Sequence, residues 1–129
     1  MPFFRADYTF VAGHYPMYTV GKHGPYDNCL KKVDDIMRKY EVTAYLSGHD
    51  HSLQVLHGRT SSYVLVSGAG SIGKGECAAR LRQSVYVGQA TSGFMRLDFA
   101  AGDSVLLRVY RYDAHVQGEV YSHWLRHRR

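Results

Sequence analysis

The sequence predicts an α/β fold in which a mixed sheet carries a flanking helix. Three observations predict it: a nearly continuous apolar run at residues 7–13, a helical spacing of apolar residues through 28–40, and several short strand patterns from residue 42 onward. Apolar runs bounded by turn residues are typical of buried strands, whereas apolar residues recurring every three or four positions indicate a helix. The chain has 129 residues without a clear linker or repeat, so we expect residues 1–129 to form one unit.

The first two elements are a strand and a helix. Residues 7–13 are almost all apolar, which is expected of a strand buried on both faces. Pro25 and Asp27 mark the start of the helix through residues 28–40, and Asp27 is able to cap it. The helix positions expected to face the core are Leu30, Val33, Ile36 or Met37, and Tyr40.

Strands account for most of the remaining chain. The expected strands are residues 42–47, a hairpin of 52–57 and 60–67 that turns near Gly58 and Arg59, and, after a polar stretch to Ser92, three final strands at 93–99, 103–113 and 116–125. In the middle one of these three, Val105, Leu107 and Val109 alternate with other residues, so one face is apolar and the other is mixed.

Histidines directly follow two of the predicted strands. Residues 44–51 read AYLSGHDH, so His49 and His51 come after an apolar run and a glycine. In extended chain these two residues would point to the same side, with Cα atoms roughly 6.5 Å apart. Such a pair alone is more often two surface histidines than a metal site. Neutral imidazole is nevertheless a frequent metal ligand, and loops at strand ends often carry functional sites.

A second strand end strengthens the metal interpretation. Residues 8–14 read YTFVAGH, which places His14 after a strand-like run and a glycine in the same way. Two strands that both end in Gly-His predict neighbouring strand ends that converge on one site. His23 follows in a glycine-flanked loop and could add a further imidazole, although alone it would be an ordinary loop histidine.

Charge, cysteines and glycines exclude several function classes. The formal net charge is +5, with much of the excess in residues 126–129 and on the helix, and no nucleic-acid-binding motif is present. We therefore expect no nucleic-acid partner, and there is no apolar run long enough to span a membrane.

Residues 68–75 are glycine-rich but lack the Gly-Lys-Ser/Thr ending of a P-loop, which favours a flexible loop near the site. Cys29 and Cys77 form no CxxC motif, and a disulfide between them is possible without specific support.

Four motifs occur in order along the first part of the chain. They are VAGHYP at residues 11–16, KHGP at 22–25, GHDHSLQ at 48–54 and SGAG at 67–70. In this order and spacing they resemble the C-terminal half of the purple acid phosphatases, nearest to the small tartrate-resistant type, within the metallophosphoesterase superfamily. Residues 7–70 carry the resemblance, and it is looser from Cys77 onward.

The resemblance implies a fold and a set of residue roles. The fold would be a portion of a four-layer αββα sandwich, of which this chain would build much of one sheet and one covering helix. His14 and His49 resemble ligands of a divalent metal, and His51 resembles a ligand of a ferric ion. His23 resembles the histidine that holds the substrate phosphate and is able to protonate the leaving group. The implied cofactor is a dinuclear metal centre, iron with iron, zinc or manganese.

The implied activity is that of an acid phosphatase. It would hydrolyse small phosphate monoesters with a metal-bound hydroxide as nucleophile, although a preference for diesters is left open. An imidazole is protonated in mildly acidic solution, which makes an acid optimum physically reasonable. The resemblance also implies a secreted or lysosomal location for the full-length protein and an upstream disulfide partner for Cys29.

The family's other ligand motifs, GDxG, GDxxY and GNH, do not occur in this sequence. Residues 1–129 would then be the C-terminal part of one metallophosphoesterase domain, Met1 would mark a truncation, an internal start or a boundary, and the N-terminal half would be a partner. We expect negligible turnover from the chain alone. The alternative is a non-catalytic metal-binding or protein-interaction module.

Overall fold

A computed structural model describes residues 6–21, 28–57, 62–71, 84–88, 91–100 and 104–126. Within these residues the chain forms one helix and eight strands. In chain order they are β1 (Phe10–Ala12), α1 (Asn28–Lys39), β2 (Ala44–Ser47), β3 (Leu53–His57), β4 (Tyr63–Ser67), β5 (Ser84–Gly88), β6 (Gly93–Ala100), β7 (Ser104–Tyr112) and β8 (Gln117–Arg126).

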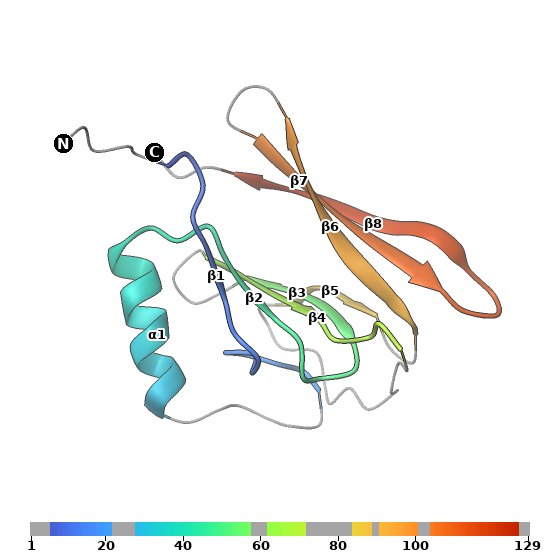
Figure 1. The fold of residues 1–129 in the computed structure, drawn as a ribbon, viewed down its shortest axis with the longest axis horizontal. Helices are drawn as coiled ribbons and strands as arrows, with labels where there is room; N and C mark the ends of the chain where they lie inside the picture. Colours follow the sequence, from blue (N-terminus) through green and yellow to red (C-terminus); the bar gives the residue numbers. More distant parts are fainter. Residues whose placement is uncertain are drawn as a thin grey trace.

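The strands form two sheets, shown in Figure 1. The five-stranded sheet has the order β1-β2-β4-β3-β5, and the three-stranded sheet has the order β6-β7-β8. In the first sheet β1, β2 and β4 are parallel, whereas β3 is antiparallel to both of its neighbours. The second sheet is antiparallel throughout. The predicted mixed sheet with a flanking helix is therefore confirmed, but the chain builds strands of two sheets rather than of one.

The first sheet lies between α1 and the second sheet, with an apolar cluster on each of its faces. Along β4, Val64 and Val66 pack in the cluster that contains Met37 of α1. Leu65, between them, packs in the cluster that contains Leu107 of β7. Successive strand residues point to opposite faces, so the unbroken apolar run of β4 is explained by a sheet covered on both sides.

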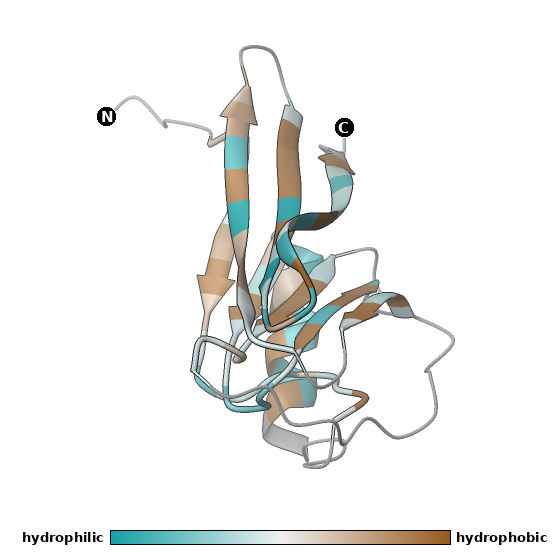
Figure 2. Cartoon of the chain, turned by 90° about the vertical axis from the view of Figure 1, so that its right-hand side faces the viewer, coloured by the Kyte–Doolittle hydropathy of each residue, from teal (hydrophilic) through white to brown (hydrophobic). Residues whose placement is uncertain are grey.

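The alternation predicted for the second sheet is confirmed. Val105, Leu107 and Val109 are fully buried against the first sheet, and Figure 2 shows hydrophobic and hydrophilic residues alternating along the strands of the three-stranded sheet. Full burial of such a side chain stabilises a fold by about 1.5–3 kcal/mol. These three residues therefore join the two sheets.

One predicted strand is shorter than expected, and one strand was missed. The run at residues 7–13 forms only the short β1, whose side chains are half-buried at Phe10 and Val11 and exposed at Ala12. The reason is its position: β1 is at the edge of its sheet, next to β2 alone. Strand β5 was not predicted, and it lies at the opposite edge beside β3.

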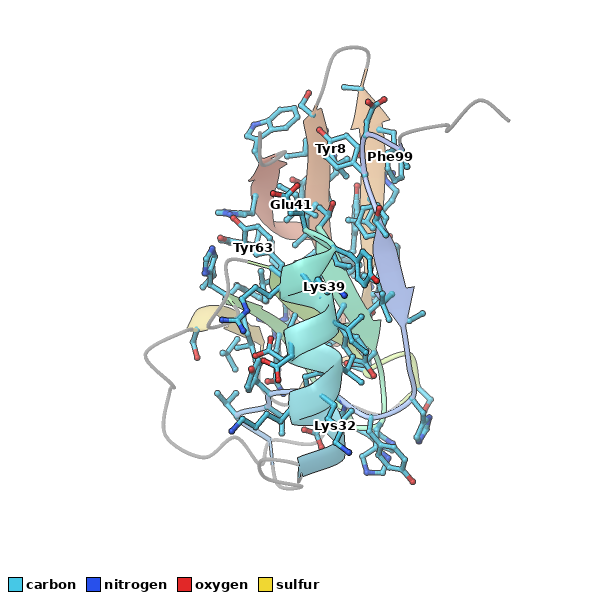
Figure 3. The ribbon with its side chains drawn as sticks, turned by 90° about the vertical axis from the view of Figure 1, so that its left-hand side faces the viewer. Tyr8, Lys32, Lys39, Glu41, Tyr63 and Phe99 are labelled. Carbon is cyan, nitrogen blue, oxygen red and sulfur yellow. The ribbon has the colours of Figure 1, made fainter. Side chains whose placement is uncertain are left out.

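The start of β1 and the residues just before it pack on the second sheet through aromatic rings. Tyr8 and Phe10 each meet the ring of Phe99 edge-on, with centroids 6.3 and 5.8 Å apart. Figure 3 shows Tyr8 and Phe99 side by side between the start of β1 and the end of β6. These contacts tie the first strand to both sheets.

The helix turns the face containing Met37, rather than Ile36, into the core. Met37 is fully buried, while Ile36 is 54% exposed and Tyr40 is 64% exposed, so the prediction of a core position for Tyr40 is wrong. Leu30 and Val33 pack against the same cluster as Met37. Tyr40 falls outside this face because α1 ends at Lys39. The predicted start at Pro25 and Asp27, and the turn near Gly58 and Arg59, lie outside the described residues.

The turn between β7 and β8 is organised by Asp113. Its Oδ1 accepts hydrogen bonds from the backbone N–H groups of His115 and Val116, each at 2.9 Å. Its Oδ2 accepts from Arg111 at 2.6 Å and from the hydroxyl of Thr91 at 3.1 Å. The backbone N–H of His115, followed by the other donors, holds the pKa of Asp113 well below its usual range.

This depressed pKa predicts a pH-dependent effect of Asp113→Asn. The carboxylate stabilises the fold at pH values above the ordinary aspartate pKa of about 4, and this stabilisation is lost as pH falls towards the lower folded-state value. Asp113→Asn should therefore lower the melting temperature at pH 7, and the deficit relative to wild type should shrink below about pH 3. Thermal unfolding at pH 7, 5 and 3 measures it, with the exposed Asp35→Asn as control. A deficit that stays constant with pH would contradict the interpretation.

Candidate metal centre

The two Gly-His strand ends meet at one edge of the first sheet. His14 follows β1 and His49 follows β2, and these strands are parallel neighbours. Nε2 of His14 and Nδ1 of His49 are 3.1 Å apart in a hydrogen bond between the two rings, whose centroids are separated by 5.0 Å. The predicted convergence of these strand ends is thus present in the fold.

Backbone pairing continues beyond β1 and brings the two histidines together. The N–H of Gly13 donates to the carbonyl of Leu46 at 2.9 Å. The N–H of Gly48 in turn donates to the carbonyl of His14 at 3.3 Å. Because the parallel ladder extends across both glycines, His14 and His49 leave the sheet side by side.

Gly13 is required by the phenol of Tyr45. A Cβ at Gly13 would overlap the hydroxyl of Tyr45, which donates to the carbonyl of Tyr15 at 2.9 Å. Burial raises the pKa of Tyr45, so the phenol remains a donor over the physiological pH range. Tyr15, held in this way, places its ring edge-on against His14 and His49, at centroid distances of 4.8 and 4.7 Å.

The chain turns sharply at His49, so the expectation of an extended HxH is wrong. His49 has a φ of 63°, and the N–H of Asp50 bonds to the carbonyl of Gly48 across it at 2.8 Å. A second bond of 2.8 Å, from Ser52 N–H to Asp50 carbonyl, turns the chain again around His51. These two three-residue turns bend the backbone out of the extended conformation. A positive φ at a residue other than glycine costs about 1–3 kcal/mol and is concentrated at functional sites.

His51 is exposed in this bend. Among the described residues, no group of three or more His, Cys, Asp or Glu side chains is arranged to hold a metal ion. The fold therefore brings His14 and His49 together, and His51 does not complete a three-ligand group with them. His23 lies outside the described residues, as do Cys77 and the end of the glycine-rich loop.

Gly68 of the SGAG motif makes room for the His49 turn. A Cβ on Gly68 would overlap the carbonyl oxygen of Asp50. The N–H of Gly68 also donates to the carbonyl of Ser52 at 3.1 Å. The end of β4 therefore supports the bend between β2 and β3, and a side chain at position 68 would clash with that bend.

A buried polar network lies behind the turn. Asp50 accepts a hydrogen bond from the hydroxyl of Thr19. The side-chain amide of Gln54 donates to Thr19 Oγ1 at 3.1 Å and to Ser52 Oγ at 2.7 Å. All four side chains are buried. Sequence reasoning assigned no role to any of them: Asp50, Ser52 and Gln54 lie within the GHDHSLQ motif, whereas Thr19 carries no sequence signal.

The histidine pair fits a metal ion in donor type and spacing. A metal ion is bound by imidazole nitrogen at about 2.0–2.1 Å, and two nitrogens 3.1 Å apart can both reach one ion at that distance. The exposed His51 supplies one further imidazole within the same bend. The pair of His14 and His49 supplies two ligands, so an ion held here would take its further ligands from water or from other side chains.

Comparison with known proteins identifies several relatives by sequence. No protein-family model matches the chain. Tartrate-resistant acid phosphatase type 5 of Oryctolagus cuniculus is 37% identical over 101 residues, 78% of this chain and 29% of the relative. The Homo sapiens protein of the same name is 36% identical over the same shares. Purple acid phosphatase 17 of Arabidopsis thaliana is 31% identical over 128 residues, 94% of this chain and 36% of the relative.

Two solved structures share the fold. GAP50, the anchor in the inner membrane complex of Plasmodium, matches with a TM-score of 0.77 at 20% identity, over 96% of this chain and 38% of its own. Purple acid phosphatase PPD1 from yellow lupin (Lupinus luteus) seeds matches with a TM-score of 0.72 at 16% identity, over 92% of this chain and 25% of its own. Within the described residues no helix is long and apolar enough to cross a membrane.

The sequence matches and the structural matches both cover most of this chain and a much smaller share of the protein that it matches. This chain spans 29% of the length of the mammalian relatives and a quarter to two fifths of the solved structures. The sequence relatives are all acid phosphatases by name. The chain belongs to the purple acid phosphatase family, and it spans a part of the length of the members it matches.

Proposed function

We propose that this chain is part of an acid phosphatase that hydrolyses small phosphate monoesters at a dinuclear metal centre. The observation that carries the proposal is the pairing of His14 with His49 at adjacent parallel strand ends, 3.1 Å between ring nitrogens. Relatives named as acid phosphatases support the reaction class.

The chain's own residues would hold metal and substrate. His14 and His49 would share one ion, and His51, exposed in the same bend, would contribute to the second. Two bound ions, iron with iron, zinc or manganese, would neutralise phosphate oxygens and activate water for in-line attack. Tyr15, which contacts both imidazoles edge-on, would limit their ring rotation and shield one side of the pair.

His23 would act on the leaving group. We propose that its imidazole, outside the ligand set, contacts the substrate phosphate and gives a proton to the departing oxygen. Protonation matters most when that oxygen is a poor leaving group, because a general acid then removes the largest charge from the transition state.

The remaining ligands would come from residues outside this sequence. It contains no GDxG, GDxxY or GNH motif, and we propose that the anionic ligands of those motifs would come from sequence beyond residues 1–129. We propose that the chain alone binds metal weakly and has negligible turnover, and that activity requires the additional length present in the relatives.

Metal titration of the 129-residue chain tests the ligand assignment. We expect one Zn²⁺ per chain by calorimetry, and His14→Ala or His49→Ala should weaken binding by at least about tenfold, because each removes one of two paired donors. His115→Ala is the matched control, since His115 is an exposed histidine in the β7–β8 turn. Zn²⁺ affinity that is equal in all four proteins would contradict the assignment.

Leaving-group dependence tests His23 in an active phosphatase that includes this chain. His23→Ala should lower kcat for alkyl phosphates by about 10²–10⁴-fold and for nitrophenyl phosphate much less, because nitrophenolate departs without protonation. Metal content, measured in parallel, should be unchanged. An equal fall in kcat on both substrates, or a fall in kcat that follows a loss of bound metal, would contradict the general-acid role.

The alternative is a non-catalytic module that keeps the fold. It predicts a different outcome of the same experiments: partner or metal binding without hydrolysis, even when the chain is joined to sequence that supplies the missing motifs. Robust hydrolysis of p-nitrophenyl phosphate by that longer protein, abolished by His49→Ala, would exclude the alternative.

A further inference from the structure

Asp50, which follows His49, is fixed by contacts of both its side chain and its backbone. The side chain of Asp50 is buried and accepts a hydrogen bond from Thr19. Its carbonyl rests against Gly68 and accepts from the N–H of Ser52 at 2.8 Å. A residue anchored through both its side chain and its backbone leaves its neighbour little freedom. The strained φ of 63° at His49 is maintained in this setting.

Thr19 is itself fixed in orientation. Its hydroxyl donates to Asp50 and accepts from the amide of Gln54 at 3.1 Å and from the N–H of Gly21 at 2.8 Å. A hydroxyl has one proton to donate, so the two accepted bonds direct that proton to Asp50. Gln54 is positioned in turn, because its Oε1 accepts from the N–H of Val20 at 2.9 Å.

Gly21 packs against both partners of the Thr19–Asp50 hydrogen bond. A Cβ at Gly21 would lie 2.5 Å from Oδ2 of Asp50 and 3.1 Å from the hydroxyl of Thr19. Both neighbours are buried and bonded, so neither can move aside without breaking the Thr19–Asp50 bond. Only the absence of a side chain at this position lets the two groups meet.

We propose that Thr19, Gln54 and Gly21 form a clamp on Asp50 that positions His49 for the metal pair. The clamp holds Asp50, Asp50 fixes the turn centred on His49, and the turn aims Nδ1 of His49 at Nε2 of His14. These are positioning residues, which act on the imidazole of His49 through Asp50 and the turn. The inference rests on the proposed function, in which His14 and His49 share one ion.

Zn²⁺ titration of the 129-residue chain provides the first test. Thr19→Val keeps the shape of the side chain and removes the hydroxyl, so Zn²⁺ affinity should fall by about 10–100-fold, as for the loss of other groups that orient metal ligands. Gly21→Ala should produce a similar loss by displacing Asp50. Thr19→Ser, which retains the hydroxyl, should bind Zn²⁺ nearly as tightly as wild type.

Ser62→Ala is the matched control for lost stability. Ser62 is also buried and donates one hydrogen bond, of 2.6 Å to the carbonyl of Val42, at a site joined to neither histidine. This variant should be destabilised like Thr19→Val in thermal unfolding while its Zn²⁺ affinity stays at the wild-type level. If Ser62→Ala and Thr19→Val lose Zn²⁺ affinity equally, the Thr19 network is merely structural and the proposal is overturned.

A metal-free measurement separates this inference from the proposed function. Nuclear Overhauser contacts between the rings of His14 and His49 should be present in wild type and in Thr19→Ser, and lost in Thr19→Val and Gly21→Ala. Retained ring contacts in both of the latter variants overturn the clamp whatever the metal data show. If Thr19→Val does not fold, Gly21→Ala decides, because it keeps every hydrogen-bonding group. Zn²⁺ affinity unaffected by His14→Ala would instead overturn the metal pair.

Discussion

Parallel pairing between β1 and β2, carried across Gly13, is the interaction on which the candidate site depends. Without the bond from Gly13 to Leu46, His14 would leave the sheet at no fixed distance from His49. The pairing needs a glycine because the phenol of Tyr45 lies where a side chain would be. That same phenol anchors Tyr15, whose ring contacts both imidazoles. The register of this strand pair therefore fixes where four side chains lie: those of Tyr45, Tyr15, His14 and His49.

The sequence predicted those features of the fold that follow from local pattern. The alternation of Val105, Leu107 and Val109, and the strand-Gly-His ends at residues 14 and 49, are such patterns, and the structure contains both. Strand β5 was missed because its position depends on pairing with β3, a partner distant in sequence that no local pattern identifies. The helical spacing left Ile36 and Met37 as alternatives for one core position, because it does not contain the direction in which the sheet lies; the structure buries Met37.

The pairing of His14 with His49 was predictable from the sequence, whereas the residues that support the pair were not. Histidine after glycine at a strand end is a visible signal, whereas the contribution of Thr19 arises only when residues 31 positions apart are brought together. The HxH segment was expected to be extended because side chains alternate in a strand. The turn at His49 departs from that rule since carbonyl and side-chain contacts of Asp50, invisible in the sequence, outweigh the backbone's own preference.

The shortness of β1 has a thermodynamic consequence. It has three residues, occupies a sheet edge and pairs with one neighbour, so it belongs to the part of a fold that opens most easily. An ion coordinated by His14 and His49 would fasten this strand to the next one, and a ligand that binds only the closed form stabilises it by about 2.7 kcal/mol at a hundred times its Kd. Local opening of β1 and metal binding at the histidine pair would then be coupled. A higher concentration of metal ion would raise the free energy needed to open β1.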